Sequence, residues 1–400
     1  MRTIKEKTKR LIAQSLEDVA DCGSLLEKIE IRTSPNPDHG DFHTNICMQI
    51  ASKYGIEAAE LARQVKSYMD GNTNIFDDIK ISPEGHVNFH LNNKYFRGVF
   101  RDIETGRFET FERKGEKKRL VVAVDKLSDI VCLCDLRAFL NMYTLAGLYD
   151  LAGYDVEKYI LAKDDNCELG ISYFLTNFDR DTGPECERIM ETEITKDAAI
   201  IEDAIVFVSQ KSLKSYPELA GKALVTEKVD LYDGENLVDC FDVGDVMENA
   251  DLERIRYSLV RMPYNKKVKL QYKENNSQKI QYVYSRTRSL MDIFKEEGSG
   301  VSFLADFDEN LLADAKEKDI VSEMSDYRQM VEKAVFEMNP AIYIEYAERL
   351  SKLFHDINDN MLYRQLEKEK LKTILKLYRS LATVISSILD QLEVNKPERM

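Results

Sequence analysis

The chain has 400 residues, of which 44% are hydrophobic and 32% are charged, and its formal net charge is −15. These values predict a soluble globular protein of two or three domains. No apolar run is long enough to span a membrane, and the charged N-terminus lacks the hydrophobic region of a secretory signal, so we expect a cytoplasmic protein. The seven cysteines are scattered without a CxxC pair, which argues against a disulfide scaffold.

Residues 1–111 are expected to form a small α+β domain. Helical periodicity in LIAQSLEDVA is followed by a short strand, EKIEIRTS, and by the helix ICMQIASKYG, which Gly55 is placed to end. After a further helix, EAAELARQVKSYM, the segment IKISPEGHVNFHL indicates two short strands around a glycine turn. The charged segment ERKGEKKR, residues 112–119, is interpreted as a linker.

Residues 112–245 alternate between strand and helix patterns. RLVVAV predicts a buried strand, DLRAFLNMYTLAGLYDLAG a helix and YDVEKYILA a second strand, which together make a βαβ-like unit. AAIIEDAIVFVS contains another buried strand. The pattern indicates a Rossmann-like α/β core with a parallel sheet, shorter than a complete enzymatic doubly wound domain.

Residues 246–400 are expected to form an all-helical bundle. The segment AIYIEYAERLSKLFHDIND places a set of apolar residues on one helix face, namely Ile342, Tyr346, Leu350, Leu353 and Ile357. LKTILKLYRSLATVISSILDQL is a second long amphipathic helix. The fold class is therefore multidomain, with an α+β domain, an α/β core and a helical bundle.

Charge is distributed unevenly along the chain. Residues 251–400 contain as many basic as acidic residues, so the acidic excess lies in residues 1–250. Residues 254–288 are rich in Lys and Arg, with tyrosines between them and a single acid. This composition suits a nucleic-acid backbone and unstacked bases, and it suits a solvated helical face equally well. Its central cations, Lys266, Lys267 and Lys269, are candidates for RNA contacts.

Four stretches, in this order, resemble the arginyl-tRNA synthetases, a family of class I aminoacyl-tRNA synthetases. The resemblance rests on PNPDHGDFHTNICMQIASKYG with GHVNFHL, on AGYDVEKYILAKDDN, on NADLERIRYSLVRMP with QKIQYVYSRTRSL, and on the C-terminal LYRSLATVISSILDQLEVNKPERM. It implies an N-terminal domain that meets the tRNA elbow, a Rossmann-like catalytic core and a C-terminal anticodon-binding bundle.

The family's first signature is a His-x-Gly-His turn that contacts ATP phosphates. Alignment through the following helix places this signature on Cys132, Leu133, Cys134 and Asp135. Both histidines are absent, Cys134 adds a side chain where the glycine admits the nucleotide, and Asp135 brings negative charge toward phosphate oxygens. The resemblance therefore implies that this turn has lost its ATP site.

The second signature, a Lys-Met-Ser-Lys loop that stabilises pyrophosphate, aligns with KVDLYDG, residues 228–234. Lys228 is retained, but Leu231 stands at the second lysine position. Loss of one group that stabilises transition-state charge typically lowers a rate by about 10²–10³-fold. With both signatures degenerate, we expect no measurable aminoacylation and no catalytic residue.

The resemblance also places residues near tRNA. The strand GHVNFHL meets the elbow in the family, which makes His86 and Asn88 candidates, and the terminal Met400 corresponds to a methionine near the anticodon. Tyr282 and Arg286 are four residues apart and share a helix face, which suits base stacking and phosphate contact. For His86 and Asn88, the alternative to RNA contact is a solvent-exposed edge strand. For Tyr282 and Arg286, the alternative is a tyrosine packed on the bundle with a solvated arginine.

Metal and cofactor chemistry is not predicted. Cys132 and Cys134 form a CxC pair, which supplies two of the four ligands that a structural zinc site needs. None of the five histidines belongs to a helical HxxxH pattern with an acid, and the chain has no glycine-rich phosphate loop. We expect no metal and no cofactor.

These inferences predict a noncatalytic relative of the arginyl-tRNA synthetases that binds tRNA, with arginine-type tRNA as the first expectation, as a regulator, carrier or decoy. The acidity of residues 1–250 favours one alternative, a protein-interaction module without RNA binding, because an acidic surface repels phosphate. The other alternative is an arginine-tRNA ligase with atypical catalytic residues. No membrane partner is expected, and the sequence specifies neither a protein partner nor an oligomeric state.

Overall fold

The computed structural model describes the chain in segments. The described residues are 4–19, 28–34, 39–126, 133–164, 192–237, 252–271, 276–298, 308–312, 314–398 and 400. The chain divides into two compact units. The N-terminal unit comprises residues 1–108, 287–328 and 352–384, and the sheet unit comprises residues 109–286, 329–351 and 385–400.

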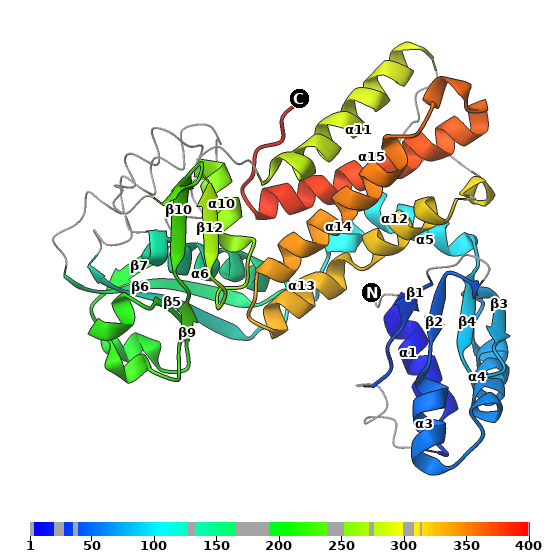
Figure 1. Ribbon diagram of the computed structural model, residues 1–400, viewed down its shortest axis with the longest axis horizontal. Helices are drawn as coiled ribbons and strands as arrows, with labels where there is room; N and C mark the ends of the chain where they lie inside the picture. The colour runs from blue at the N-terminus through cyan, green and yellow to red at the C-terminus, as the bar shows by residue number, and fades with distance from the viewer. Residues whose placement is uncertain are drawn as a thin grey trace. The chain divides into compact units, whose positions relative to one another are not determined.

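An antiparallel sheet with the strand order β1-β2-β4-β3 is the framework of residues 1–108 (Figure 1). Its strands are β1 Arg32–Thr33, β2 Phe42–Thr44, β3 Phe76–Ile81 and β4 Val87–Leu91. The helices are α1 Ile4–Ser15, α3 Ile46–Tyr54, α4 Ala58–Asn72 and α5 Lys94–Glu104. Along β4 buried residues alternate with half-buried polar ones, so one face of the sheet meets the core and the other meets solvent.

Two glycines set the turns of this sheet domain. The predicted helix end at Gly55 is confirmed, because Gly55 has a left-handed φ of 70° and its N–H donates to the carbonyl of Ala51. Gly40 has a φ of 90°, and a Cβ on it would lie 2.6 Å from the carbonyl oxygen of Phe89. Only glycine allows the chain to enter β2 this close to β4.

A fully parallel sheet with the strand order β7-β6-β5-β8-β9 forms the centre of the sheet unit. Its strands are β5 Lys117–Lys126, β6 Asp155–Asp164, β7 Thr192–Thr195, β8 Ile205–Ser209 and β9 Leu224–Thr226. Helix α6, Leu133–Leu151, connects β5 to β6 and confirms the predicted βαβ unit. The predicted linker is wrong at its end, because residues 117–119 already pair with β6 as part of β5.

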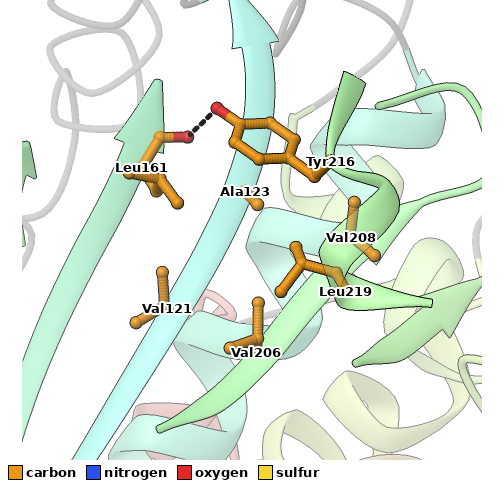
Figure 2. Packing of buried hydrophobic residues seen from close by; sticks show 7 residues of the cluster. All are labelled: Val121, Ala123, Leu161, Val206, Val208, Tyr216 and Leu219. Atoms are coloured by element: carbon orange, nitrogen blue, oxygen red, sulfur yellow. Dashed lines mark hydrogen bonds between the residues drawn. The ribbon is translucent and has the colours of Figure 1, made fainter. Parts of the chain in front are cut away.

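The two faces of the parallel sheet are covered differently. Helix α6 packs against β5, β6 and β8. A buried cluster includes Val121, Ala123, Val206 and Val208 together with Tyr216 and Leu219 from the short 3₁₀ turns at Ser212–Ser215 and Pro217–Leu219 (Figure 2). Among the described residues, these short turns therefore cover the cluster.

A second, three-stranded sheet corrects the prediction that residues from 246 onward are nearly all helical. Its order is β11-β10-β12, with β10 Val229–Asp233, β11 Asn236–Leu237 and β12 Val268–Gln271. Strand β12 pairs in parallel with β10, so Leu231 lies opposite Leu270. Each of these strands contributes too short a pattern to be separated from helix by periodicity alone.

Helices dominate the remainder. They are α10 Leu252–Val260, α11 Gln278–Glu296, α12 Ala315–Ser325, α13 Tyr327–Phe336, α14 Ala341–Asn358 and α15 Lys368–Gln391. On α14 the predicted apolar face is buried at Ile342, Tyr346, Leu350 and Ile357, and Leu353 is half-buried.

No helix within the described segments is long and apolar enough to cross a membrane. The predicted fold class, with its α+β domain, α/β core and helical C-terminal region, is confirmed.

Candidate functional site

The turn that aligns with the family's ATP signature leads into helix α6. Cys132 lies outside the described residues, and Cys134 is half-buried in the first turn of the helix. Asp135, the next residue, is completely buried. An acidic side chain in the first helical turn is favourably placed near the partial positive charge of the helix N-terminus.

Contacts from the end of β8 surround the Asp135 carboxylate. Its Oδ1 accepts hydrogen bonds from Ser209 Oγ at 2.5 Å and from Ser212 Oγ at 2.7 Å. The Nζ of Lys211 lies 3.7 Å from Oδ2. The carboxylate is therefore bound by the protein's own hydroxyls and lies close to the cation of Lys211.

These contacts lie at the carboxyl edge of the parallel sheet. In doubly wound sheets, ligands bind beyond the carboxyl ends of strands where the strand order reverses, which here lies between β5 and β8. Asp135 and Ser209 occupy that position. Next to it, the hydroxyl of Tyr216 donates to the carbonyl of Val124 in β5 at 2.8 Å and to the carbonyl of Leu161 in β6 at 3.3 Å, the second of which is drawn in Figure 2. These side chains thus occupy part of the edge.

Arg137, two residues further along α6, is the most heavily bonded side chain near the turn. It is completely buried, and each of its N–H groups donates to a backbone carbonyl at 2.6–3.2 Å. The accepting carbonyls belong to Glu227, Leu259, Met262, Pro263 and Lys266. Arg137 therefore fixes to helix α6 the chain just before β10 and the segment that leads into β12.

The stretch aligned with the second signature is a strand rather than a loop. Leu231 is buried in β10, so the second lysine position faces the interior of the small sheet. Lys228 is exposed before the strand, and its Nζ lies 2.8 Å from Asp230. The hydrogen bond and charge of Asp230 raise the pKa of Lys228.

A polar row crosses the solvent face of the N-terminal sheet. Arg32 lies opposite His43, His43 lies opposite Asn88, and Asn88 lies opposite Lys80. The row therefore crosses all the strands of this sheet. Side chains directly opposite one another project to the same face. The candidate Asn88 is therefore at the centre of the row, and the candidate His86 begins the strand on the same face.

The histidines of this face influence one another. The rings of His43 and His86 are 6.4 Å apart, centroid to centroid. Burial lowers the pKa of His43, and the nearby His86, Arg32 and His39 lower it further. Neighbouring positive charge thus keeps the pKa of His43 below its ordinary value, and an added anion would reverse that effect.

Internal contacts use part of the basic stretch at residues 254–288. Arg256 is buried and paired with Glu393, and Arg261 Nε lies 2.5 Å from the carboxylate of Glu348. The hydroxyl of Tyr257 also donates to Glu348, at 3.1 Å. These groups stabilise the sheet unit.

The three candidate lysines, Lys266, Lys267 and Lys269, are exposed beside β12. Lys269 Nζ lies 5.9 Å from the centre of the Tyr232 ring, within reach of a cation–π contact. Among the described residues, these lysines form a short basic edge on the three-stranded sheet. Their side chains can contact phosphate.

The other candidates have less distinctive surroundings. Tyr282 and Arg286 are both half-buried on one face of α11, so base contact and packing on the bundle both remain compatible with them. Met400 is 55% exposed at the C-terminus.

A pocket of about 320 Å³ lies among α6, β6 and the residues after α15. Two of its acidic side chains already have partners: Glu393 accepts from Tyr143 and pairs with Arg256, and Asp390 pairs with Lys396. No cluster of metal-binding side chains occurs in the described parts of the chain. The sheet edge and the N-terminal sheet face are therefore the more informative sites.

Sequence reasoning did not identify the serines that bind Asp135, the carbonyls around Arg137, or Arg32 and His43. The serines lie 74 and 77 residues beyond Asp135, and no local pattern links them. For the sheet face a partial signal existed, since Asn88 belongs to a predicted strand, whereas no strand was predicted at His43. Only the strand register places them opposite one another.

Comparison with known proteins agrees with this architecture. The model of the arginyl tRNA synthetase N terminal domain matches residues 6–91, and that of the DALR anticodon binding domain matches residues 280–400. The structure is similar to the arginyl-tRNA synthetase of Thermus thermophilus, with a TM-score of 0.71 and 14% identity over 99% of this chain and all of that one. The Plasmodium falciparum arginyl-tRNA synthetase gives a TM-score of 0.67 with 12% identity over the whole of both chains.

Curated relatives match shorter segments. An arginine–tRNA ligase of Staphylococcus carnosus is 24% identical over 227 residues, which are 55% of this chain and 40% of the relative. One from Methanosarcina barkeri is 27% identical over 162 residues, 39% of this chain and 28% of the relative. The matched parts thus span well under half of these relatives.

The fold and its two terminal domains define a multidomain protein of the aminoacyl-tRNA synthetase class. Within that class, the chain belongs with the arginyl-tRNA synthetases, whose N-terminal and anticodon-binding domains it carries.

Proposed function

We propose that the chain is a noncatalytic relative of the arginyl-tRNA synthetases that binds tRNA, or a tRNA-like RNA, as a regulator, carrier or decoy. The observation that carries the loss of catalysis is the burial of Asp135. Its carboxylate accepts hydrogen bonds from Ser209 and Ser212 at the sheet edge, so a phosphate bound there would meet a buried like charge.

RNA binding is supported by the two matched domains and by two polar surfaces. The N-terminal sheet presents Arg32, His43, Asn88 and Lys80 in one row. The edge of the three-stranded sheet presents the exposed lysines 266, 267 and 269. The row on the N-terminal sheet and Lys269 lie on regular strands, which hold their side chains at fixed spacing for phosphate contacts, and Lys266 and Lys267 lie just before β12.

The first test is retention of total cellular tRNA by the purified protein at about 50 mM and about 200 mM salt. Salt-sensitive retention, with one acceptor enriched on sequencing, is the expected result. Replacing Lys266, Lys267 and Lys269 by alanine should reduce the salt slope by about three units, because each phosphate contact contributes roughly one. Lys222→Ala, at an exposed turn before β9, is the matched control. No retention at low salt would contradict RNA binding.

ATP–pyrophosphate exchange with arginine and tRNA tests catalysis. We expect exchange no faster than without protein. Measurable exchange would instead establish an arginine-tRNA ligase with atypical catalytic residues, the activity that the family implies for any active form. Asp135→Ala should then reduce that exchange if the sheet edge is the site.

A protein-interaction module is the second candidate. It is favoured by the acidity of residues 1–250 and by Phe336, which is 87% exposed at the end of α13. If no RNA is retained, affinity capture with the wild type and with Phe336→Ser identifies a partner that depends on this aromatic side chain. Equal capture by both proteins would remove Phe336 from that surface.

A further inference from the structure

The pocket of about 320 Å³ in the sheet unit has the size of a small-molecule site, since such sites measure roughly 300–1,000 Å³. Its walls come from the second half of α6, from the start of β6 and from the end of α15 with Glu393 beyond it. Asp135 lies in the first turn of α6, toward the other end of that helix. The pocket is therefore a separate site from the turn that aligns with the ATP signature.

One end of the pocket is cationic. The Nζ of Lys158 lies 5.2 Å from the centre of the Tyr143 ring, which places the ammonium group beside that ring. The carboxylate of Glu393 is at the same end, but it already accepts a hydrogen bond from the Tyr143 hydroxyl at 2.8 Å and pairs with the buried Arg256. Because Glu393 and Arg256 neutralise each other, the net charge of this end is that of Lys158.

The opposite end of the pocket is anionic. Asp150 is exposed two helical turns after Tyr143, a rise of about 10 Å along α6. Asp390 also lines the pocket, but its carboxylate is paired with Lys396 at 2.5 Å. No ion pair joins Asp150 to another described side chain, so its carboxylate sets the charge of this end.

The wall between the two charged ends is largely apolar. Ala146 and Gly147 lie on α6 between these ends, and Val156 of β6 lines the same pocket. A Cβ on Gly147 would meet the amide group of Gln391, so the absence of a side chain there leaves room for the end of α15. A hydrocarbon chain can pack on this wall, because removal of apolar surface from water is favourable.

We propose that this pocket binds a small zwitterion that carries an ammonium group and a carboxylate at opposite ends of a hydrocarbon chain, as ω-amino acids and basic amino acids do. The carboxylate of the ligand pairs with Lys158, its ammonium group pairs with Asp150, and its chain packs on the apolar wall. A single ion pair near solvent contributes little, so both charged ends are needed for measurable affinity. A dianion or a dication would bring a like charge to one end of the pocket, which repels it.

The test is isothermal titration calorimetry of the full chain with 6-aminohexanoate up to about 10 mM, so that a dissociation constant of about 1 mM or tighter is detected. We expect saturable binding at one site. Hexanoate, which lacks the ammonium group, and hexylamine, which lacks the carboxylate, should each bind about fivefold or more weakly, because one charged contact is lost. The zwitterion should also raise the midpoint of thermal unfolding, since it binds only the folded chain.

Two variants test whether the ligand lies in this pocket. Asp150→Asn and Lys158→Met should each weaken binding of 6-aminohexanoate by about fivefold or more. Asp150 is exposed, and methionine keeps the apolar stem of the half-buried Lys158, so both variants fold. Asp155→Asn is the matched control and should keep the wild-type affinity, because Asp155 is exposed at the start of β6 and does not line the pocket.

Three outcomes would overturn the inference. The first is an absence of saturable binding to the wild type. The second is binding of hexanoate or hexylamine as tight as that of the zwitterion, because one charged end would then be unused. The third is undiminished binding to both Asp150→Asn and Lys158→Met, because the ligand would then lie elsewhere on the chain.

Discussion

Replacement of Arg137 tests how the sheet unit is held together. The guanidinium donates to carbonyls just before β10 and in the segment that leads into β12, and all of its N–H groups are used. Burial lowers the pKa of Arg137 to about 10, which still leaves it charged at neutral pH. Arg137→Met keeps much of the volume but removes every donor.

The expected loss of stability follows from the number and kind of these hydrogen bonds. A hydrogen bond that involves a charged group contributes about 1.5–3 kcal/mol, so independent bonds would sum to more than 7 kcal/mol. The cost of removing the guanidinium from water, several kcal/mol, offsets part of this gain. We therefore expect Arg137→Met to lower the free energy of unfolding of the sheet unit by about 3–5 kcal/mol.

Urea unfolding followed by far-ultraviolet circular dichroism measures the loss. With a denaturant slope of about 2 kcal/mol per molar urea, the midpoint of the sheet unit should fall by about 2 M. The urea midpoint of Arg137→Lys should lie between those of the wild type and Arg137→Met, because a lysine keeps the charge with fewer donors. Arg119→Met is the matched control, since the polar contacts of Arg119 are long, 3.4 Å to the carbonyl of Glu202 and 3.5 Å to the carboxylate of Glu157. A loss below about 1 kcal/mol for Arg137→Met would refute the reasoning.

Three further predictions concern the N-terminal unit. Gly40→Ala should destabilise it by about 1–3 kcal/mol in thermal unfolding, because the new Cβ meets the Phe89 carbonyl at a positive φ; unchanged stability would show that the turn can shift. Burial raises the pKa of Cys47 to about 12, so its thiol should resist alkylation at pH 8 in the folded protein. The contribution of Cys47 to stability should fall as pH rises above about 9, because only the thiol of the unfolded chain ionises there. Rapid alkylation of the native protein would contradict this prediction. Lys376→Met should lower the free energy of unfolding by about 3–5 kcal/mol, because it leaves the buried Glu104 carboxylate without its partner. Replacement of both residues by apolar ones should lower it much less. Equal urea midpoints for the single and double variants would contradict a stabilising role for this ion pair.

Local patterns determined much of the architecture. The helix end at Gly55, the βαβ unit around α6 and the buried face of α14 each depend on residues close in sequence, and each is present as predicted. The residue types at the positions aligned with the two signatures were likewise visible in the sequence, and the loss of function inferred from them stays a prediction. Periodicity and capping act over one or two turns, so a sequence carries them directly.

Tertiary structure decided which residues meet. Strand β12 lies in a stretch with no strand pattern of its own and exists because it pairs with β10, nearly 40 residues earlier. From the sequence, Asp135 is predicted only to repel phosphate. In the structure, its buried carboxylate accepts hydrogen bonds from Ser209 and Ser212. The row from Arg32 to Lys80 depends on the register of antiparallel strands. Such contacts join residues with no local relation, and the gain from burial and hydrogen bonding appears only once the chain has folded.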